Sequence, residues 1–243
     1  MTIIGSDGGL LEAPVTGNRF TLFNAERLDV VIDFARYPVG ISVVLHNGVE
    51  GDRADHWAYP YLLPDIMRFD IVRNEPDPSD FPPQLASVER LHPDDAVRTR
   101  KFVLDFTAGH WTINGLMYDP ARIDADPRLG TTEIWEFENR SDLPHDVHRH
   151  LVQFQILTGF EGGPPLPIRR GWKDTQRVAP HDTISLIVPF EGYTSVYVFH
   201  CHMLEHAEHM MMGEFEVVGP DGFGASAAPP SSAFACSLPT STT

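Results

Sequence analysis

Residues 197–215 read YVFHCHMLEHAEHMMMGEF, and they place one cysteine, four histidines and four methionines between two strand-like runs. The runs SVYVFH and GEFEVVG are rich in β-branched and aromatic residues, which is typical of strands. Successive side chains of a strand point to opposite faces. We therefore expect His200 and His202 to share one face of the strand and Cys201 to point to the other.

A second histidine cluster lies upstream, in the segment LPHDVHRHLVQFQIL of residues 143–157. If this segment begins extended, His148 and His150 share one face and His145 points to the other. Two such strands side by side would create two sites on opposite faces. One site holds an imidazole and a thiol, from His145 and Cys201. The other holds the four imidazoles of His148, His150, His200 and His202.

The mixed site can gain further ligands from the loop that follows, because His206 and the methionines of residues 210–212 lie a few residues beyond Cys201. Two imidazoles, one thiolate and a weak thioether are the ligand set of a blue-copper electron-transfer site. Three consecutive methionines leave the thioether ligand open, and each is equally consistent with core packing. Structural zinc is the competing interpretation, although such sites usually contain more cysteines.

The rest of the chain predicts many short strands joined by turns. The expected strands before residue 75 are FTLF, DVVIDF, ISVVLH and IMRFDIV. Those after residue 100 are KFVLDFT, HWTINGLMY, TTEIWEFEN, LVQFQILT and TISLIVPF, followed by the two runs quoted first. This density of strands predicts an all-β sandwich or barrel. We expect a partial domain at residues 1–75, a proline-rich linker at 76–100, a complete β-domain at 101–220 and a disordered tail at 221–243.

Composition narrows the classes of partner. The 243 residues carry a net charge of −16, which argues against binding nucleic acid or docking on an anionic membrane. No apolar run approaches the roughly 20 residues of a membrane-spanning helix. The first residues, MTIIGSDGG, lack a basic region followed by an apolar one, so no secretory signal is predicted. We expect a cytoplasmic location if Met1 is the true start.

The segments HDVHRH and HCHMLEHAEHM together resemble the paired C-terminal copper signatures of the multicopper oxidases. The resemblance is to the branch of spore-coat laccase, bilirubin oxidase and phenoxazinone synthase, and it covers about residues 1–220. It implies a cupredoxin-like Greek-key β-sandwich as the last domain. IGSDGGLLEAPV and AERLDVVIDF resemble the later part of the middle domain, which implies a partial second cupredoxin domain at the N-terminus.

The resemblance also implies a role for each ligand. It assigns the type 1 copper to His145, Cys201, His206 and Met211, the type 2 copper to His148, and the type 3 pair to His150, His200 and His202. A small reductant would give single electrons to the type 1 copper near an exposed edge of His206. Cys201 and its neighbours would carry them to the cluster, where dioxygen is reduced to water.

This sequence departs from the family in three places. The family's cluster uses eight histidines, four of them from two His-x-His motifs in a first domain, whereas this chain has only the pairs 148/150 and 200/202. We therefore expect a complete type 1 site but half of the type 2/type 3 cluster, with a first cupredoxin domain supplied upstream or by another chain. Asp146 replaces a proline, and Ala207 replaces an acid, so Glu205 or Glu208 would have to supply protons.

Three hypotheses follow. The favoured one is a laccase-like multicopper oxidase fragment, a copper-dependent oxidoreductase acting on phenolic or similar small reductants. In that hypothesis, Cys201, His206 and Glu208 are the catalytic residues. The alternative is a non-enzymatic blue-copper protein that carries electrons or binds copper. A third is a copper-free remnant whose open strand edges invite pairing with another chain.

Overall fold

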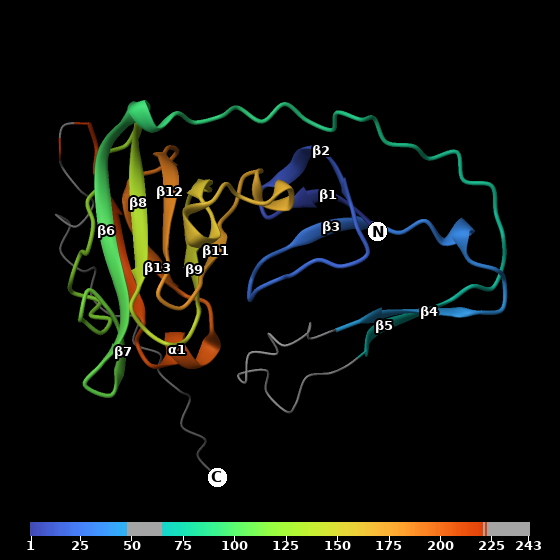
Figure 1. The fold of residues 1–243 in the computed structure, drawn as a ribbon. Coiled ribbons are helices and arrows are strands. Elements are labelled where there is room, and N and C mark those ends of the chain that lie inside the picture. Colours follow the sequence, from blue (N-terminus) through green and yellow to red (C-terminus); the bar gives the residue numbers. More distant parts are fainter. Residues whose placement is uncertain (48–64, 221, 223–243) are drawn as a thin grey trace, which may run out of the picture.

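The computed structural model describes residues 1–47, 65–220 and 222. Two layers of strands form a β-sandwich in the C-terminal part of the chain (Figure 1). The first layer has the strand order β10-β12-β8-β6-β7 and the second has the order β11-β9-β13-β14. The first layer consists of β6 (Ala96–Thr107), β7 (His110–Ile113), β8 (Thr131–Asn139), β10 (Gln155–Thr158) and β12 (Thr183–Phe190). The second consists of β9 (His145–Arg149), β11 (Thr175–Val178), β13 (Ser195–Cys201) and β14 (Met212–Val217).

The sandwich core is built from alternating apolar residues of both layers. Strand β8 alternates buried and half-buried positions, and its Trp135 is fully buried. The Trp135 ring lies 4.9 Å from that of Phe102 and 5.5 Å from those of Phe199 and Phe215, measured between centroids. Burying each such side chain contributes about 1.5–3 kcal/mol. The predicted all-β sandwich is confirmed.

The N-terminal residues form two smaller units (Figure 1). A three-stranded sheet has the order β2-β1-β3, from β1 (Thr2–Ser6), β2 (Gly9–Thr16) and β3 (Leu28–Val31). A hairpin pairs β4 (Ser42–His46) with β5 (Asp65–Asp70). The sheet buries Ile3 and Leu11 against Ile168, which lies in the turn η5 (Pro167–Arg169) of the sandwich domain.

A buried ion cluster fastens the N-terminal segment to the sandwich. Lys173 Nζ lies 2.8 Å from Asp7 Oδ2 and 3.1 Å from Glu26 Oε1, and all three side chains are at most 2% exposed. At its edge, Arg27 donates two hydrogen bonds of 2.6 Å to the Asp174 carboxylate. Since a buried charge is costly unless it is paired, this cluster fixes where the segment lies on the sandwich.

Short helical turns connect the strands. They are η1 (Phe34–Arg36), η3 (Pro93–Asp95), η4 (Phe160–Gly162), η5 and α1 (Leu204–Glu208). Among the described residues, none of these is long and apolar enough to cross a membrane.

The structure corrects one strand prediction in the N-terminal part and adds two strands. The run FTLF is not a strand. Its Phe23 ring instead lies under the guanidinium groups of Arg169 and Arg177, 4.6 and 4.5 Å from their central carbons. Strands β1 and β2 were not predicted, although the turn residues SDGG between them are a hairpin signal.

One predicted boundary falls inside a strand of the structure. Strand β6 begins at Ala96, inside the segment predicted as linker, because residues 96–100 pair with β8. In that pairing, Arg100 forms a 2.6 Å ion pair with the buried Glu133. The division into domains otherwise stays a prediction, and the tail at 223–243 lies outside the described residues.

Candidate metal centres

Strands β9 and β13 lie side by side and bring the two histidine clusters together. They pair antiparallel, with His148 opposite His200 and Val147 opposite Cys201. His145 and Cys201 are buried on the face toward the sandwich core, at 0% and 1% exposure. The alternation predicted from sequence therefore produces two separate groups of metal-binding side chains on opposite faces of one sheet.

The first group is a compact triangle of two imidazoles and one thiol. His145 Nδ1 and His206 Nδ1 are 3.1 Å apart, and Cys201 Sγ lies 3.7 Å from the first and 3.5 Å from the second. A point equidistant from these three atoms is about 2.0 Å from each, which is a metal–ligand bond length. Soft sulfur with two imidazoles is the donor set that suits copper in both oxidation states, so the residues fit the ion.

Burial sets the protonation of this triangle. Burial, reinforced by His206, lowers the pKa of His145 to about 3, and burial lowers the pKa of His206 to about 4. Burial also raises the pKa of the Cys201 thiol to about 12. At neutral pH the imidazoles are therefore free to bind a metal, whereas the thiol must lose its proton first.

Ser141 fixes the orientation of the first imidazole. Its Oγ lies 2.8 Å from His145 Nε2, the nitrogen that faces away from the triangle. Ser141 Oγ also donates to Asn139 Oδ1 or to the carbonyl of Leu143, at 2.9 and 3.0 Å. A hydrogen bond at the outer nitrogen of a histidine holds the ring and selects the tautomer that leaves the inner nitrogen free.

The backbone of Met211 is hydrogen-bonded to both His206 and Cys201. Its backbone N–H donates to the carbonyl of His206 at 3.0 Å, and its carbonyl accepts from the N–H of Cys201 at 3.1 Å. The residue is fully buried in the same core cluster as Cys201. Met210 is exposed and Met212 half-buried, so burial alone separates Met211 from its neighbours. The thioether ligand role of Met211 stays a prediction.

The second group gathers four imidazoles on the opposite face. The ring of His148 lies 5.2 Å from His150 and 5.4 Å from both His200 and His202. Ligand nitrogens of His148, His150 and His200 all lie within 4.8 Å of one another. The ring of His202 contacts the rings of His148 and His200. His202 and His150 are both exposed. This group is consequently more open to solvent than the buried triangle.

His148 is oriented by residues at the start of β11. Its Nδ1 lies 2.9 Å from Thr175 Oγ1 and 3.0 Å from the carbonyl of Asp174. The Asp174 carboxylate is 3.6 Å from the same nitrogen and is held from the other side by Arg27. These contacts occupy Nδ1 and leave Nε2 of His148 to face the other imidazoles.

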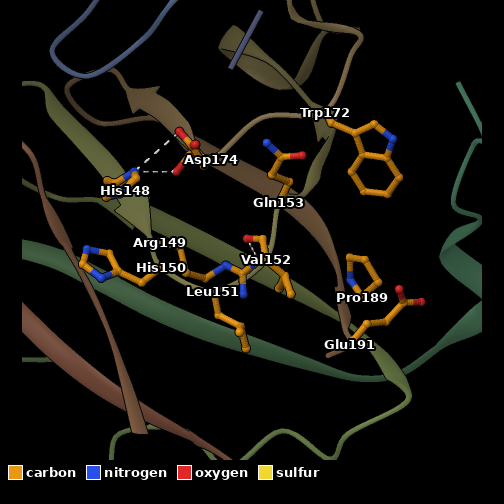
Figure 2. A pocket seen from close by; sticks show the side chains of 10 residues that line it. All are labelled: His148, Arg149, His150, Leu151, Val152, Gln153, Trp172, Asp174, Pro189 and Glu191. Atoms are coloured by element: carbon orange, nitrogen blue, oxygen red, sulfur yellow. Dashed lines mark hydrogen bonds and ion pairs between the residues drawn. The ribbon is translucent and has the colours of Figure 1, made fainter. Parts of the chain in front are cut away.

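A cleft of about 600 Å³ opens beside the second group. Figure 2 shows His148 and His150 at one end of it and Trp172, Pro189 and Glu191 at the other. Burial lowers the pKa of His200 to about 4, and the pKa of His150 is also lowered, by burial and by His148. Imidazoles grouped beside an open cleft can bind a metal that remains accessible to a small molecule.

Comparison with known proteins agrees with these two groups. The model of the multicopper oxidase family matches residues 80–221, which is more than half of the chain and contains every histidine of both groups. This chain belongs to the multicopper oxidase family. Its fold is accordingly a cupredoxin-like β-sandwich, and copper is the metal expected of the family.

Similar curated proteins include oxidases with named activities. The laccase of Bacillus subtilis (strain 168) is 33% identical over 89% of this chain and 46% of its own length. The bilirubin oxidase of Albifimbria verrucaria is 33% identical over 90% of this chain and 40% of its own length. This multicopper oxidase chain thus spans less than half the length of these relatives.

Solved structures of multicopper oxidases also resemble this chain. The McoA multicopper oxidase of Aquifex aeolicus aligns with a TM-score of 0.77 and 28% identity, over 89% of this chain and 49% of that one. The laccase of Pediococcus acidilactici Pa5930 aligns with a TM-score of 0.76 and 32% identity, over 89% of this chain and 44% of that one. Both alignments extend beyond the sandwich domain of this multicopper oxidase chain into its N-terminal part.

The structure describes the surroundings of two predicted catalytic residues. The imidazole of His206 is only 3% exposed, so its edge is covered rather than open to solvent. Glu208 is exposed at the end of α1, and none of the hydrogen bonds or ion pairs found among the described residues joins it to either group. Its role as proton donor stays a prediction.

The sequence did not single out several residues that shape the sites of this multicopper oxidase chain. They are Ser141, Trp111, Asp174 and Thr175. The contacts of Trp111, Asp174 and Thr175 join distant parts of the chain, so no local spacing predicts them. Ser141 lies only four residues before His145, and this short separation is the one local signal that could have indicated it.

Proposed function

We propose that this chain supplies the copper-binding end of a laccase-like oxidase that takes single electrons from a small reductant and passes them to dioxygen. One observation carries the proposal: a buried thiol with two imidazoles lies back to back with four imidazoles across the single strand β13. When bound, copper would supply one-electron chemistry at the first group and oxygen reduction at the second.

The residues of β13 provide the connection between the groups. The side chain of Cys201 belongs to the first group, whereas its covalent neighbours His200 and His202 belong to the second. The carbonyl of Cys201 also accepts a hydrogen bond from His200 Nδ1 at 2.9 Å. We propose that His145, Cys201, His206 and Met211 hold one copper and that His148, His150, His200 and His202 hold part of a cluster. The connection between the two groups is therefore covalent and a few bonds long.

The second group is proposed to need a partner. Its imidazoles are partly exposed, and this chain covers less than half of its curated relatives, so a first cupredoxin domain would complete the ligand set. That domain could be encoded upstream or lie on another chain. Relatives named laccase and bilirubin oxidase support small aromatic reductants as the class of substrate.

The test is spectroscopic and then catalytic. Copper-loaded protein should develop a strong absorption band at roughly 600 nm, and Cys201→Ser should abolish it. Oxygen consumption with a phenolic reductant should be negligible for the chain alone and should appear when a first cupredoxin domain is added. A copper-loaded chain without the blue band would contradict the proposal.

A non-enzymatic electron carrier is the second candidate. It is favoured by one observation: among the described residues, only the first group forms a closed, fully buried set. A blue protein that never consumes oxygen, with or without an added first domain, would select this alternative.

A further inference from the structure

A relay of hydrogen bonds joins the N-terminal segment to His148 of the second group. Arg27 donates from Nη1 and Nη2 to the two carboxylate oxygens of Asp174, at 2.6 Å each. The same carboxylate accepts the hydroxyl of Thr175 at 3.0 Å, and Thr175 Oγ1 lies 2.9 Å from His148 Nδ1. Figure 2 shows Asp174 beside His148, with the contacts between them dashed. Two intermediate residues therefore separate Arg27 from a predicted metal ligand.

The direction of this relay follows from its chemistry. A guanidinium only donates, and a carboxylate paired with it only accepts. Thr175 Oγ1 therefore gives its proton to Asp174 and is left to accept from His148. The Asp174 carbonyl, 3.0 Å from the same Nδ1, can also only accept. When the imidazole is neutral, its proton consequently lies on Nδ1, and Nε2 keeps the lone pair that a metal ion needs.

Asp7 holds the same backbone from the other side. It lies in the turn between β1 and β2, and its Oδ2 accepts the N–H groups of Asp174 and Thr175 at 3.3 and 3.4 Å. A trans peptide is planar and points its N–H and C=O in opposite directions. Binding the Thr175 N–H to Asp7 thus aims the Asp174 carbonyl at His148, where a backbone N–H of β9 also reaches it at 3.1 Å. Asp7 steadies Arg27 as well, by accepting its N–H at 2.8 Å.

We propose that Arg27 and Asp7 are positioning residues for His148. Docked on the sandwich, the N-terminal segment fixes the ring orientation and the Nδ1–H tautomer with which His148 offers Nε2 to copper. This inference rests on the proposed function, in which His148 binds copper of the second group. The first group depends on the sandwich domain instead, because Ser141 holds the outer nitrogen of His145. Loss of the segment's contacts should therefore weaken the second group and spare the first.

The first test determines the tautomer of His148 in the metal-free chain. Long-range ¹H–¹⁵N NMR spectra distinguish a protonated from an unprotonated imidazole nitrogen, and His148→Gln assigns the His148 signals. At about pH 8, where imidazoles of ordinary pKa are neutral, the wild type should carry the proton on Nδ1. Arg27→Ala and Asp7→Ala should move the two nitrogen signals toward each other, because both tautomers then exchange. A wild-type proton on Nε2, or wild-type signals in both variants, would overturn the proposal.

Two matched controls separate positioning from a general loss of charge or stability. Arg36→Ala removes an exposed arginine of the same segment, paired with Asp33, and should leave the His148 signals in place. Glu26→Gln removes a buried carboxylate beside the same Lys173, but Glu26 holds the N–H of Phe23 rather than Asp174 or Thr175. It should destabilise the junction and keep the tautomer. Arg27→Ala breaks a half-exposed ion pair only, so it decides the question alone if Asp7→Ala does not fold.

The second test compares the copper affinities of the two groups, each measured with the other silenced. With Cys201→Ser, Arg27→Ala should lower the copper(II) affinity of the second group about tenfold, by competition with a chelator, and Arg27→Lys should restore most of it. With His148→Ala and His200→Ala, the copper(I) affinity of the first group should stay within about twofold after the same change. Equal losses at both groups, or no loss at the second, would overturn the proposal.

The two tests distinguish this proposal from the function on which it rests. A copper-loaded chain that never turns blue contradicts the proposed function, and the tautomer of His148 in the metal-free chain still decides the role of Arg27 and Asp7. A blue chain whose His148 signals and second-group affinity ignore both residues keeps the proposed function and loses this inference.

Discussion

Ser141 shows how a single hydroxyl can govern a buried metal site. It binds the outer nitrogen of His145 at 2.8 Å. Ser141→Ala removes that partner and leaves a buried N–H unsatisfied, which costs about 1–3 kcal/mol of unfolding free energy in the metal-free chain. We also expect copper(I) affinity to fall about 10- to 100-fold, measured by competition with a chromophoric chelator. Ser141→Thr, which keeps a hydroxyl, is the control; equal affinity for Ser141→Ala and the wild type would contradict the prediction.

Arg149 is a buried charge in the core, and no pattern in the sequence predicts it there. It lies between His148 and His150 but points to the opposite face, and its guanidinium carbon lies 5.3 Å from the Trp135 ring centroid. Its Nε and Nη1 have no hydrogen-bond partner among the residues that the structure describes, and burial lowers its pKa to about 9. The surroundings therefore disfavour the charge that the folded chain carries at neutral pH.

Replacing this guanidinium with an apolar side chain should not weaken the fold. We expect Arg149→Met to raise the unfolding free energy by about 1–3 kcal/mol, because two unsatisfied donors and a desolvated charge disappear. Urea denaturation of the metal-free chain at pH 7 measures this. A loss of stability would show that the contact with the aromatic rings outweighs the desolvation penalty.

At the scale of elements, the sequence predicted the strands whose apolar residues alternate or form a continuous run. The runs at residues 131–139 and 183–190 match β8 and β12. In β8 one face packs on the core and imposes period two, whereas β12 is a nearly continuous apolar run with three consecutive buried residues. The same period predicted the division of the histidines between two faces. FTLF failed because its phenylalanines pack against arginine side chains of a distant segment, and such long-range contacts leave no local pattern. The contacts of Trp111 with His145 and His206 could not be predicted for the same reason.

The junction between the N-terminal segment and the sandwich depends on Lys173. This side chain is 1% exposed and is paired with the buried carboxylates of Asp7 and Glu26. Lys173→Ala leaves both carboxylates without their cation, and we expect it to cost about 3–5 kcal/mol of stability and to expose the segment to proteases. Arg27→Ala, at a half-exposed ion pair, should cost about 1 kcal/mol or less. Similar losses for both variants, by urea denaturation and limited proteolysis, would contradict this ranking.

At the scale of the whole molecule, the sandwich sets the chemistry of the triangle by excluding water from it. Burial raises the pKa of the Cys201 thiol to about 12 and lowers the pKa values of His145 and His206 to about 3 and 4. At neutral pH the thiol is therefore protonated and both imidazoles are neutral. The raised thiol pKa means that the metal-free chain still holds this proton at neutral pH. The lowered imidazole pKa values mean that no further proton remains on those rings above about pH 5.

Copper binding should therefore release about one proton per ion, and copper affinity should rise about tenfold per pH unit between pH 5 and 8. The measurement is competition titration with copper(I) across that range, in a chain whose second group is silenced by His148→Ala and His200→Ala. Calorimetry in two buffers of different ionisation enthalpy counts the proton independently. Adding Cys201→Ser should flatten the pH dependence, because a serine hydroxyl does not ionise in this range. An affinity that ignores pH in the chain with Cys201 intact would mean that the thiolate is not a ligand, and the blue-copper assignment would fail with it.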